Sequence, residues 1–247
     1  MPTIANAYSI HYVDGSKNGN GSSWANANKY LQDALFNASS GDEIWVAKGT
    51  YYPDEGAGQT NDARASTFQL ISGVSLYGGF FGNETSLSQR NWTNNPTILS
   101  GDLDQSGIIH SEDDDWEHYH AYYSDAYHVV TGANNAVLDG FTITRGRALN
   151  DPYSVPLTSG GGMYNNNSSP TVTNCIFLKN TATHGAGMYN DNSSSPTVTD
   201  CTFSRNGADV GGGMTNMFSS SSTVTNCIFD SNDAYSGAGG MSNWDAS

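Results

Sequence analysis

The chain has 247 residues, and its 24 acidic residues outnumber its nine Lys and Arg residues, which gives a formal net charge of −15. This charge excludes a protein that grips a nucleic-acid backbone through basic residues and argues against docking onto an anionic membrane. No apolar run approaches the roughly 18 residues of a membrane-spanning helix. The 28 Gly residues and the low charged fraction of 13% favour short strands and turns over long helices.

Residues 1–24 form an N-terminal segment, and the first predicted element after it is a helix. Apolar side chains recur at helical spacing from Tyr30 to Leu35, and Gly41 follows as a stop signal. We therefore predict a capping helix over residues 25–41. It is expected to cover the first coil of strands and to hide strand edges that would otherwise invite aggregation.

Residues 42–135 contain short strand patterns that are separated by long loops. The pattern predicts irregular coils with excursions between them. The predicted strands are Glu43–Ala47, Phe68–Leu70, Val74–Tyr77, Ile98–Leu99 and His128–Val130.

Residues 136–247 are dominated by a repeat of 26 residues. The segment Ser169–Asn180 recurs as Ser195–Asn206 and again as Ser221–Asn232. A Gly-rich block that contains Met and Asn alternates with it, and each unit holds two or three short strands separated by Gly, Asn and Ser turns. Repeats of this length are typical of an all-β solenoid, in which residues 26 apart stack at the spacing of about 4.8 Å between strands.

Stacking of this kind predicts columns of like side chains, and amides in a column are expected to bond along the axis. Three cysteines fall in one column, so they act as small interior residues and not as a disulfide framework. An earlier copy, Leu138–Gly146, aligns with Val172–Asn180, with extra residues inserted between 147 and 159. The predicted columns are Val172/Val198/Val224, Cys175/Cys201/Cys227, Phe177/Phe203/Phe229, Asn180/Asn206/Asn232, Met163/Met188/Met214/Met241 and Asn165/Asn190/Asn216/Asn243.

The repeat, which pairs Gly-Gly-x-Met with Cys-x-Phe-x-x-Asn, resembles the right-handed parallel β-helix proteins that bacteria export or display on their surface. It is similar in particular to the repeats of chlamydial polymorphic outer membrane proteins. The resemblance implies a right-handed parallel β-helix and an extracellular or cell-surface location in bacteria. It also implies an adhesive or structural role, although the outer-membrane barrel of the chlamydial proteins has no counterpart in this sequence.

The best metal candidate is the acidic segment that begins at Asp102. Asp at positions one and three, Ser at position five and Gly at position six match the first half of a calcium loop. The predicted Ca²⁺ ligands are Asp102, Asp104, Ser106, Ile108 and Asp113. The alternative is an acidic surface loop that holds no ion.

A second candidate site is a column of cations in the repeats. Arg145, Lys179 and Arg205 share one position, which Ser231 occupies in the last coil. One interpretation is a stripe that binds cell-surface glycans, and the other is a set of solvated turn residues. His118, His120 and His128 leave a similar choice between a shared transition metal and aromatic packing.

Two classes of function remain open on the sequence. The first is a structural or adhesive surface solenoid without catalytic residues, because the repeats single out no unique polar constellation. The second is a polysaccharide lyase or glycoside hydrolase with its site between Asp102 and His128, or a carbohydrate-binding module. The chain stops partway through a coil, which predicts either a fragment of a longer solenoid or end-to-end pairing of copies through the open C-terminal coil.

Overall fold

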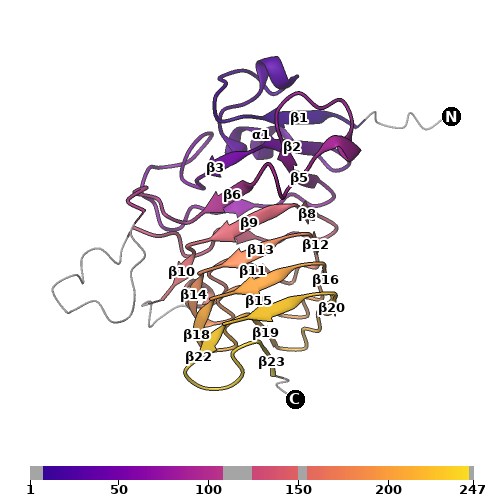
Figure 1. The fold of residues 1–247 in the computed structure, drawn as a ribbon. Helices are drawn as coiled ribbons and strands as arrows, with labels where there is room; N and C mark the ends of the chain where they lie inside the picture. The colour runs from indigo at the N-terminus through magenta and orange to yellow at the C-terminus, as the bar shows by residue number, and fades with distance from the viewer. Residues whose placement is uncertain (1–7, 108–123, 150–154, 245–247) are drawn as a thin grey trace.

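Parallel strands in stacked coils make up almost all of the regular structure. The computed structural model describes residues 8–107, 124–149 and 155–244. The described strands form four sheets that run along the molecule, and the chain visits them in the same order in successive coils (Figure 1). We call these sheets faces 1 to 4 in that order. The predicted solenoid is confirmed.

Faces 1 and 2 are adjacent and extend along most of the molecule. Face 1 comprises β1 (Ile10–Val13), β2 (Glu43–Ala47), β5 (Ser75–Phe80), β8 (Val137–Asp139), β12 (Thr171–Thr173), β16 (Thr197–Thr199) and β20 (Thr223–Thr225). Face 2 comprises β3 (Gly49–Tyr51), β6 (Thr97–Ser100), β9 (Phe141–Thr144), β13 (Ile176–Leu178), β17 (Thr202–Ser204) and β21 (Ile228–Asp230).

Face 3 occurs only in the later coils, whereas face 4 begins near the front. Face 3 comprises β10 (Arg147–Ala148), β14 (Thr181–His184), β18 (Gly207–Val210) and β22 (Asp233–Ala234). Face 4 comprises β4 (Phe68–Gln69), β7 (Val130–Thr131), β11 (Met163–Asn166), β15 (Met188–Asp191), β19 (Met214–Met217) and β23 (Met241–Trp244). Each regular coil therefore holds four strands, and the expectation of two or three was too low because the short strands of face 3 carry a weak apolar pattern.

The register between coils confirms the predicted columns. Val172 pairs with Val198 and Val198 with Val224, and the Met column aligns in the same way on face 4. The rings of Phe177 and Phe203 stack with centroids 4.6 Å apart, and the next pair in the column is 4.8 Å apart. In each Thr-Val-Thr strand the central Val points into the core and the Thr residues point outward, as the alternation of a strand requires.

Two ladders of Asn side chains run parallel to the axis, and all of their members except the last in each ladder, Asn232 and Asn243, are buried. In one, the Asn180 side chain donates to Asn206 Oδ1 (3.0 Å), and that of Asn206 donates to Asn232 Oδ1 (2.9 Å). In the other, three hydrogen bonds of 2.6–2.8 Å join four side chains in sequence, with Asn165, Asn190 and Asn216 each donating to the next and Asn243 accepting the last bond. These bonds pair most of the buried amide groups, whose burial without a partner would be costly, although Asn165 Oδ1 at the start of the second ladder has no partner among the described residues.

The corners between faces depend on residues with positive φ. Asn174, Asp200 and Asn226 follow the face 1 strands with φ values of 50–54°. Asn and Asp adopt this left-handed conformation more readily than other non-Gly residues. At the next corner, between faces 2 and 3, the cationic column occupies the same conformation, with φ of 61° at Arg145 and 54° at Lys179 and Arg205.

The helix is shorter than predicted. A 3-10 turn spans Trp24–Asn26, and α1 spans Leu31–Asn37, in place of one helix over residues 25–41. Asn28 is drawn into the sheet instead, since its N–H donates to Tyr12 O (2.8 Å) and its carbonyl accepts from Asp14 N (2.9 Å). The helix packs against β1, β2 and β4 of the first coil, with Leu31 and Leu35 buried, which fits the predicted capping role.

At the other end, β20 to β23 form the outermost described coil (Figure 1). The predicted pairing of copies through this coil stays a prediction. No helix in the described ranges is both long and apolar enough to cross a bilayer.

Removing one side chain from the ladder of Asn180, Asn206 and Asn232 is expected to destabilise the solenoid. Asn206 is fully buried, and its Oδ1 accepts from the backbone and side-chain nitrogens of Asn180 at 3.0 Å each. Asn206→Ala leaves these donors unpaired, so we expect a loss of about 3 kcal/mol in the free energy of unfolding, measured by urea titration. Asn94→Ala, at an exposed turn, is the control and should change it by less than about 0.5 kcal/mol. Equal effects of the two substitutions would contradict the structural importance of the ladder.

Candidate functional site

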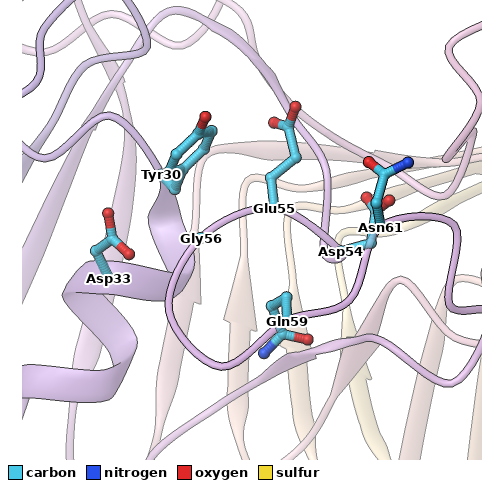
Figure 2. A pocket seen from close by; sticks show the side chains of 7 residues that line it. All are labelled: Tyr30, Asp33, Asp54, Glu55, Gly56, Gln59 and Asn61. Carbon is cyan, nitrogen blue, oxygen red and sulfur yellow. The ribbon is translucent and has the colours of Figure 1, made fainter.

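The pocket that stands out lies between α1 and the loop of residues 52–66 in the front coils. It has a volume of about 530 Å³ and opens to solvent, and Figure 2 shows its lining side chains around the loop. A volume of this order suits a small organic ligand or part of a larger one. The pocket is lined by Tyr30, Asp33, Asp54, Glu55, Gly56, Gln59 and Asn61.

Side chains of the helix hold the loop in place. Gln32 is buried and donates to the carbonyl oxygens of Pro53 (2.6 Å) and Thr67 (3.0 Å), near the two ends of the loop. Asp33 Oδ1 accepts from Ala57 N at 2.8 Å. At Gly56, with φ of 100°, a Cβ would lie 2.7 Å from the Cβ of Tyr30, so only Gly allows this approach. The pocket is therefore preformed.

The pocket is strongly acidic. Asp33, Asp54 and Glu55 contribute carboxylates, and Gln59 and Asn61 contribute amides. Burial raises the pKa of Glu55, and the hydrogen bond that it accepts from Gln105 (3.3 Å) opposes this shift.

A second acidic group lies at the corner between faces 2 and 3, where two of the predicted site residues meet. Arg145 Nη1 donates to Asp102 Oδ2 at 2.8 Å, and Arg145 Nη2 donates to Gly107 O at 2.8 Å. Asp102 also accepts from Gly107 N at 3.1 Å. The structure thus joins a predicted calcium ligand and a predicted glycan-binding cation in one ion pair.

Asp125 completes this group and was missed by the sequence reasoning. Its backbone bridges to that of Asp102. Burial raises the pKa of Asp125 to about 7, the charges of Asp102 and Asp104 raise it too, and Arg147 and Arg145 oppose the shift. A carboxyl group with a pKa near neutrality beside a second carboxylate is an arrangement suited to proton transfer.

Arg64 connects the pocket loop to the corner. Its Nε donates to Asp125 O at 2.7 Å and its Nη2 donates to Arg147 O at 2.9 Å, while its guanidinium lies over the Tyr127 ring. Tyr52 lies near both groups of carboxylates. Burial raises its pKa, and the charges of Asp102 at the corner and Glu55 in the pocket raise it further. The pocket loop and the corner are therefore neighbours, although no residue of the corner lines the pocket.

The calcium prediction covers residues of which only the first three are described by the structure. Asp102, Asp104 and Ser106 lie together, and Ser106 N donates to Asp104 Oδ1 at 3.0 Å. Ile108 and Asp113 lie outside the described residues. No group of three or more His, Cys, Asp or Glu side chains suited to a metal ion occurs in the described ranges.

The remaining predicted candidates are separated in the structure. Lys179 and Arg205 occupy the corner below Arg145, in successive coils, as the column predicts. His128 stacks on the Tyr164 ring, with centroids 4.9 Å apart, and its Nδ1 lies 3.0 Å from Gly160 O. This favours the packing interpretation for His128, whereas His118 and His120 lie outside the described residues.

The raised pKa of Asp125 has a consequence for stability. Folding strengthens proton binding by this carboxyl group, so the free energy of unfolding should fall as pH rises from its ordinary pKa of 3.8 to about 7. Asp125→Asn should reduce this decline by about 2 kcal/mol, since one pKa unit corresponds to about 1.4 kcal/mol and solvent screens part of the full shift. Urea titrations across this range measure it. Asp233→Asn, at an exposed position, should leave the slope unchanged, and an unchanged slope for Asp125→Asn would contradict the assignment.

Comparison with protein families identifies the architecture. The model of the right handed beta helix region matches residues 119–247, which is more than half of the chain. The searches of curated proteins and of solved structures gave no significant match. The match covers face 4 from β7 onward and every regular coil, and it agrees with the parallel register of all four faces. The chain therefore belongs to the right-handed β-helix family, with a helix capping its first coil.

Proposed function

We propose that this protein is a secreted or cell-surface β-solenoid with a structural and adhesive role and without catalytic activity. The observation that carries the proposal is the constant register of the coils from β11 to β23, in which each strand pairs with its counterpart in the next coil and outer positions such as Thr171, Thr197 and Thr223 carry the same residue. A catalytic site interrupts such a repeat with one unmatched constellation. Stacked repeats instead offer an extended surface that can contact a partner at many similar points.

The adhesive contact is assigned to the corner between faces 2 and 3, with cell-surface glycans as the partner. Lys179 is partly exposed and Arg205 is exposed, and they lie at the same corner of successive coils. Arg145 contributes less directly, because its guanidinium is held by Asp102 and Gly107. The extracellular location rests on the resemblance of the repeats to exported bacterial proteins.

Replacing both cations with Ser tests the adhesive contact. The double variant Lys179→Ser/Arg205→Ser copies the residue that the last coil carries at Ser231, so the corner geometry should persist. We expect affinity for immobilised anionic glycans to fall about tenfold, since two exposed charge contacts contribute about 1.4 kcal/mol together. Surface plasmon resonance at low salt measures the loss. Lys17→Ser, at an exposed site in the front segment, is the control, and unchanged binding by the double variant would reject the contact.

We also propose that the Asp102 loop binds calcium and that the ion changes the contacts at this corner. Asp102 Oδ2 already accepts from Arg145 and Gly107, so an ion there must displace the guanidinium. Oxygen donors remain at Asp104 and Ser106. The role proposed for calcium is therefore to free Arg145 for a ligand.

Polysaccharide cleavage is the second candidate function, and the position of Asp125 next to Asp102, where burial raises its pKa, is the observation that favours it. A carboxyl group with a pKa of about 7 can donate a proton to a glycosidic oxygen, while Asp102, paired with Arg145, carries the opposite role of base or nucleophile. The concentration of carboxylates favours a neutral glycan over an anionic uronate polymer, because like charges repel. Hydrolysis is accordingly favoured over elimination.

A panel of neutral and uronic-acid polysaccharides separates the two functions. If the second function holds, the protein releases reducing sugar from a neutral polymer, and Asp125→Asn lowers kcat by at least about 100-fold through loss of the general acid. Asp209→Asn should retain full activity. Absence of turnover on every polymer would reject the hydrolase, whereas robust turnover would overturn the non-catalytic role. Absorbance of an unsaturated product from uronates would instead identify elimination.

A further inference from the structure

The acidic pocket between α1 and the loop of residues 52–66 has no role in the glycan contact or in the proposed chemistry at Asp125. We propose that this pocket binds the primary ammonium group of an organic cation, such as a polyamine or an amino sugar. The argument rests on the charge of the pocket, on a buried oxygen without a partner and on the spacing of the carboxylates. It is independent of both proposed functions.

Charge is the first observation. Asp33, Asp54 and Glu55 line the pocket. The neighbouring cation is Lys29, whose Nζ donates to the hydroxyl of the lining residue Tyr30 at 3.0 Å and interacts with the charge of Glu55. Three carboxylates against one ammonium leave the pocket electronegative, and the net charge of −15 adds to the field. A cationic ligand is therefore attracted, and an anionic one is repelled.

Asp54 supplies the second observation. Its residue exposure is only 4%, and it lines the pocket beside Asn61 (Figure 2). Its Oδ2 accepts from Asp62 N at 2.8 Å, but its Oδ1 is buried and has no hydrogen-bond partner among the described residues. A buried carboxylate oxygen left unpaired is costly, and a donor that enters the pocket removes this cost.

The spacing of the carboxylates favours an ammonium group over a bare metal ion. Metal ions such as Ca²⁺ need several oxygen ligands at 2.3–2.6 Å from one point, as a rule of about six to eight. In the part of the chain that the structure describes, no three acidic side chains gather in this way. An ammonium group carries three N–H donors that point in different directions, so it can bond to carboxylates that are spread around a cavity.

The loop that forms one side of the pocket is held in place by hydrogen bonds and close packing, which favours ligand binding. The loop is held by Gln32 at Pro53 and Thr67, by Asp33 at Ala57 and by the close approach of Gly56 to Tyr30. A preformed site loses less conformational entropy on binding than a flexible one. The cavity of about 530 Å³ accommodates a short polyamine chain or one sugar ring.

Isothermal titration calorimetry on the full chain tests the proposal with two separate ligands. Spermidine represents a polyamine, and a glucosamine oligomer represents an amino sugar, with the N-acetylated oligomer as its uncharged counterpart. We expect at least one of the two cationic ligands to bind, with the acetylated oligomer at least tenfold weaker than its cationic parent if the sugar is the ligand. The arm that binds identifies the source of the ammonium group.

Three variants locate the binding. Glu55→Gln should weaken affinity at least fivefold, because it removes one wall charge from a partly exposed position. Lys29→Gln should strengthen it about twofold, because it removes the competing cation at the rim. Asp209→Asn removes the same unit of charge as Glu55→Gln at an exposed distant site and should change affinity less than 1.5-fold. The difference between Glu55→Gln and Asp209→Asn, which remove the same charge at different places, distinguishes the pocket from general attraction to an acidic protein.

Three results would overturn the proposal. They are the absence of binding by both cationic ligands, an equal loss for Glu55→Gln and Asp209→Asn, and competition by Ca²⁺ that shows a metal to be the tighter ligand. Circular dichroism of each variant confirms that it is folded, so that a loss of binding is attributed to the pocket. These outcomes are independent of the glycan and hydrolysis assays, which monitor other residues.

Discussion

Hydrogen bonding between successive coils is the interaction on which the rest of the structure depends. Each coil is too small to bury its own apolar side chains, so it gains a core only by lying in register on the coil before it. The backbone ladder fixes that register, and the amide ladders at Asn180 and Asn190 fix it again inside the molecule. A slip of one residue would turn Val198 outward and leave buried amides unpaired. The Asn columns therefore specify the alignment as well as stabilising it.

This constraint divides the molecule into regular coils, which repeat closely, and front coils, which contain long insertions. The regular coils repeat because any departure breaks a ladder. The front coils tolerate long excursions, since their strands are joined by loops that lie outside the stack and are held by side chains such as Gln32 and Arg64. The carboxyl group of Asp125, the pocket and the Asp102–Arg145 ion pair all occur among these loops or next to them. The acidic residues of the candidate site therefore lie in or next to the irregular front coils and not in the regular repeats.

Sequence reasoning was most successful where repetition is strict. The columns of Val172, Cys175 and Phe177 follow from a 26-residue offset alone, and β2 has the predicted bounds because its apolar run is unbroken. The site was harder to predict, because its residues come from distant parts of the chain. Asp125 gains its character from burial and from Asp102, neither of which a linear pattern shows. The sequence signal that could have predicted the pocket is the pair of acidic residues followed by closely spaced glycines in the loop between β3 and β4.

The separation of the loop from the stack also bears on how such a protein changes over evolutionary time. The pocket is attached to the first coils by helix α1 and by Gln32, and none of its lining residues comes from the 26-residue units. Duplicating a 26-residue unit in the gene would therefore lengthen the solenoid by about 4.8 Å without changing any residue that lines the pocket. The length of the rod and the chemistry of the proposed binding pocket can therefore change independently of each other.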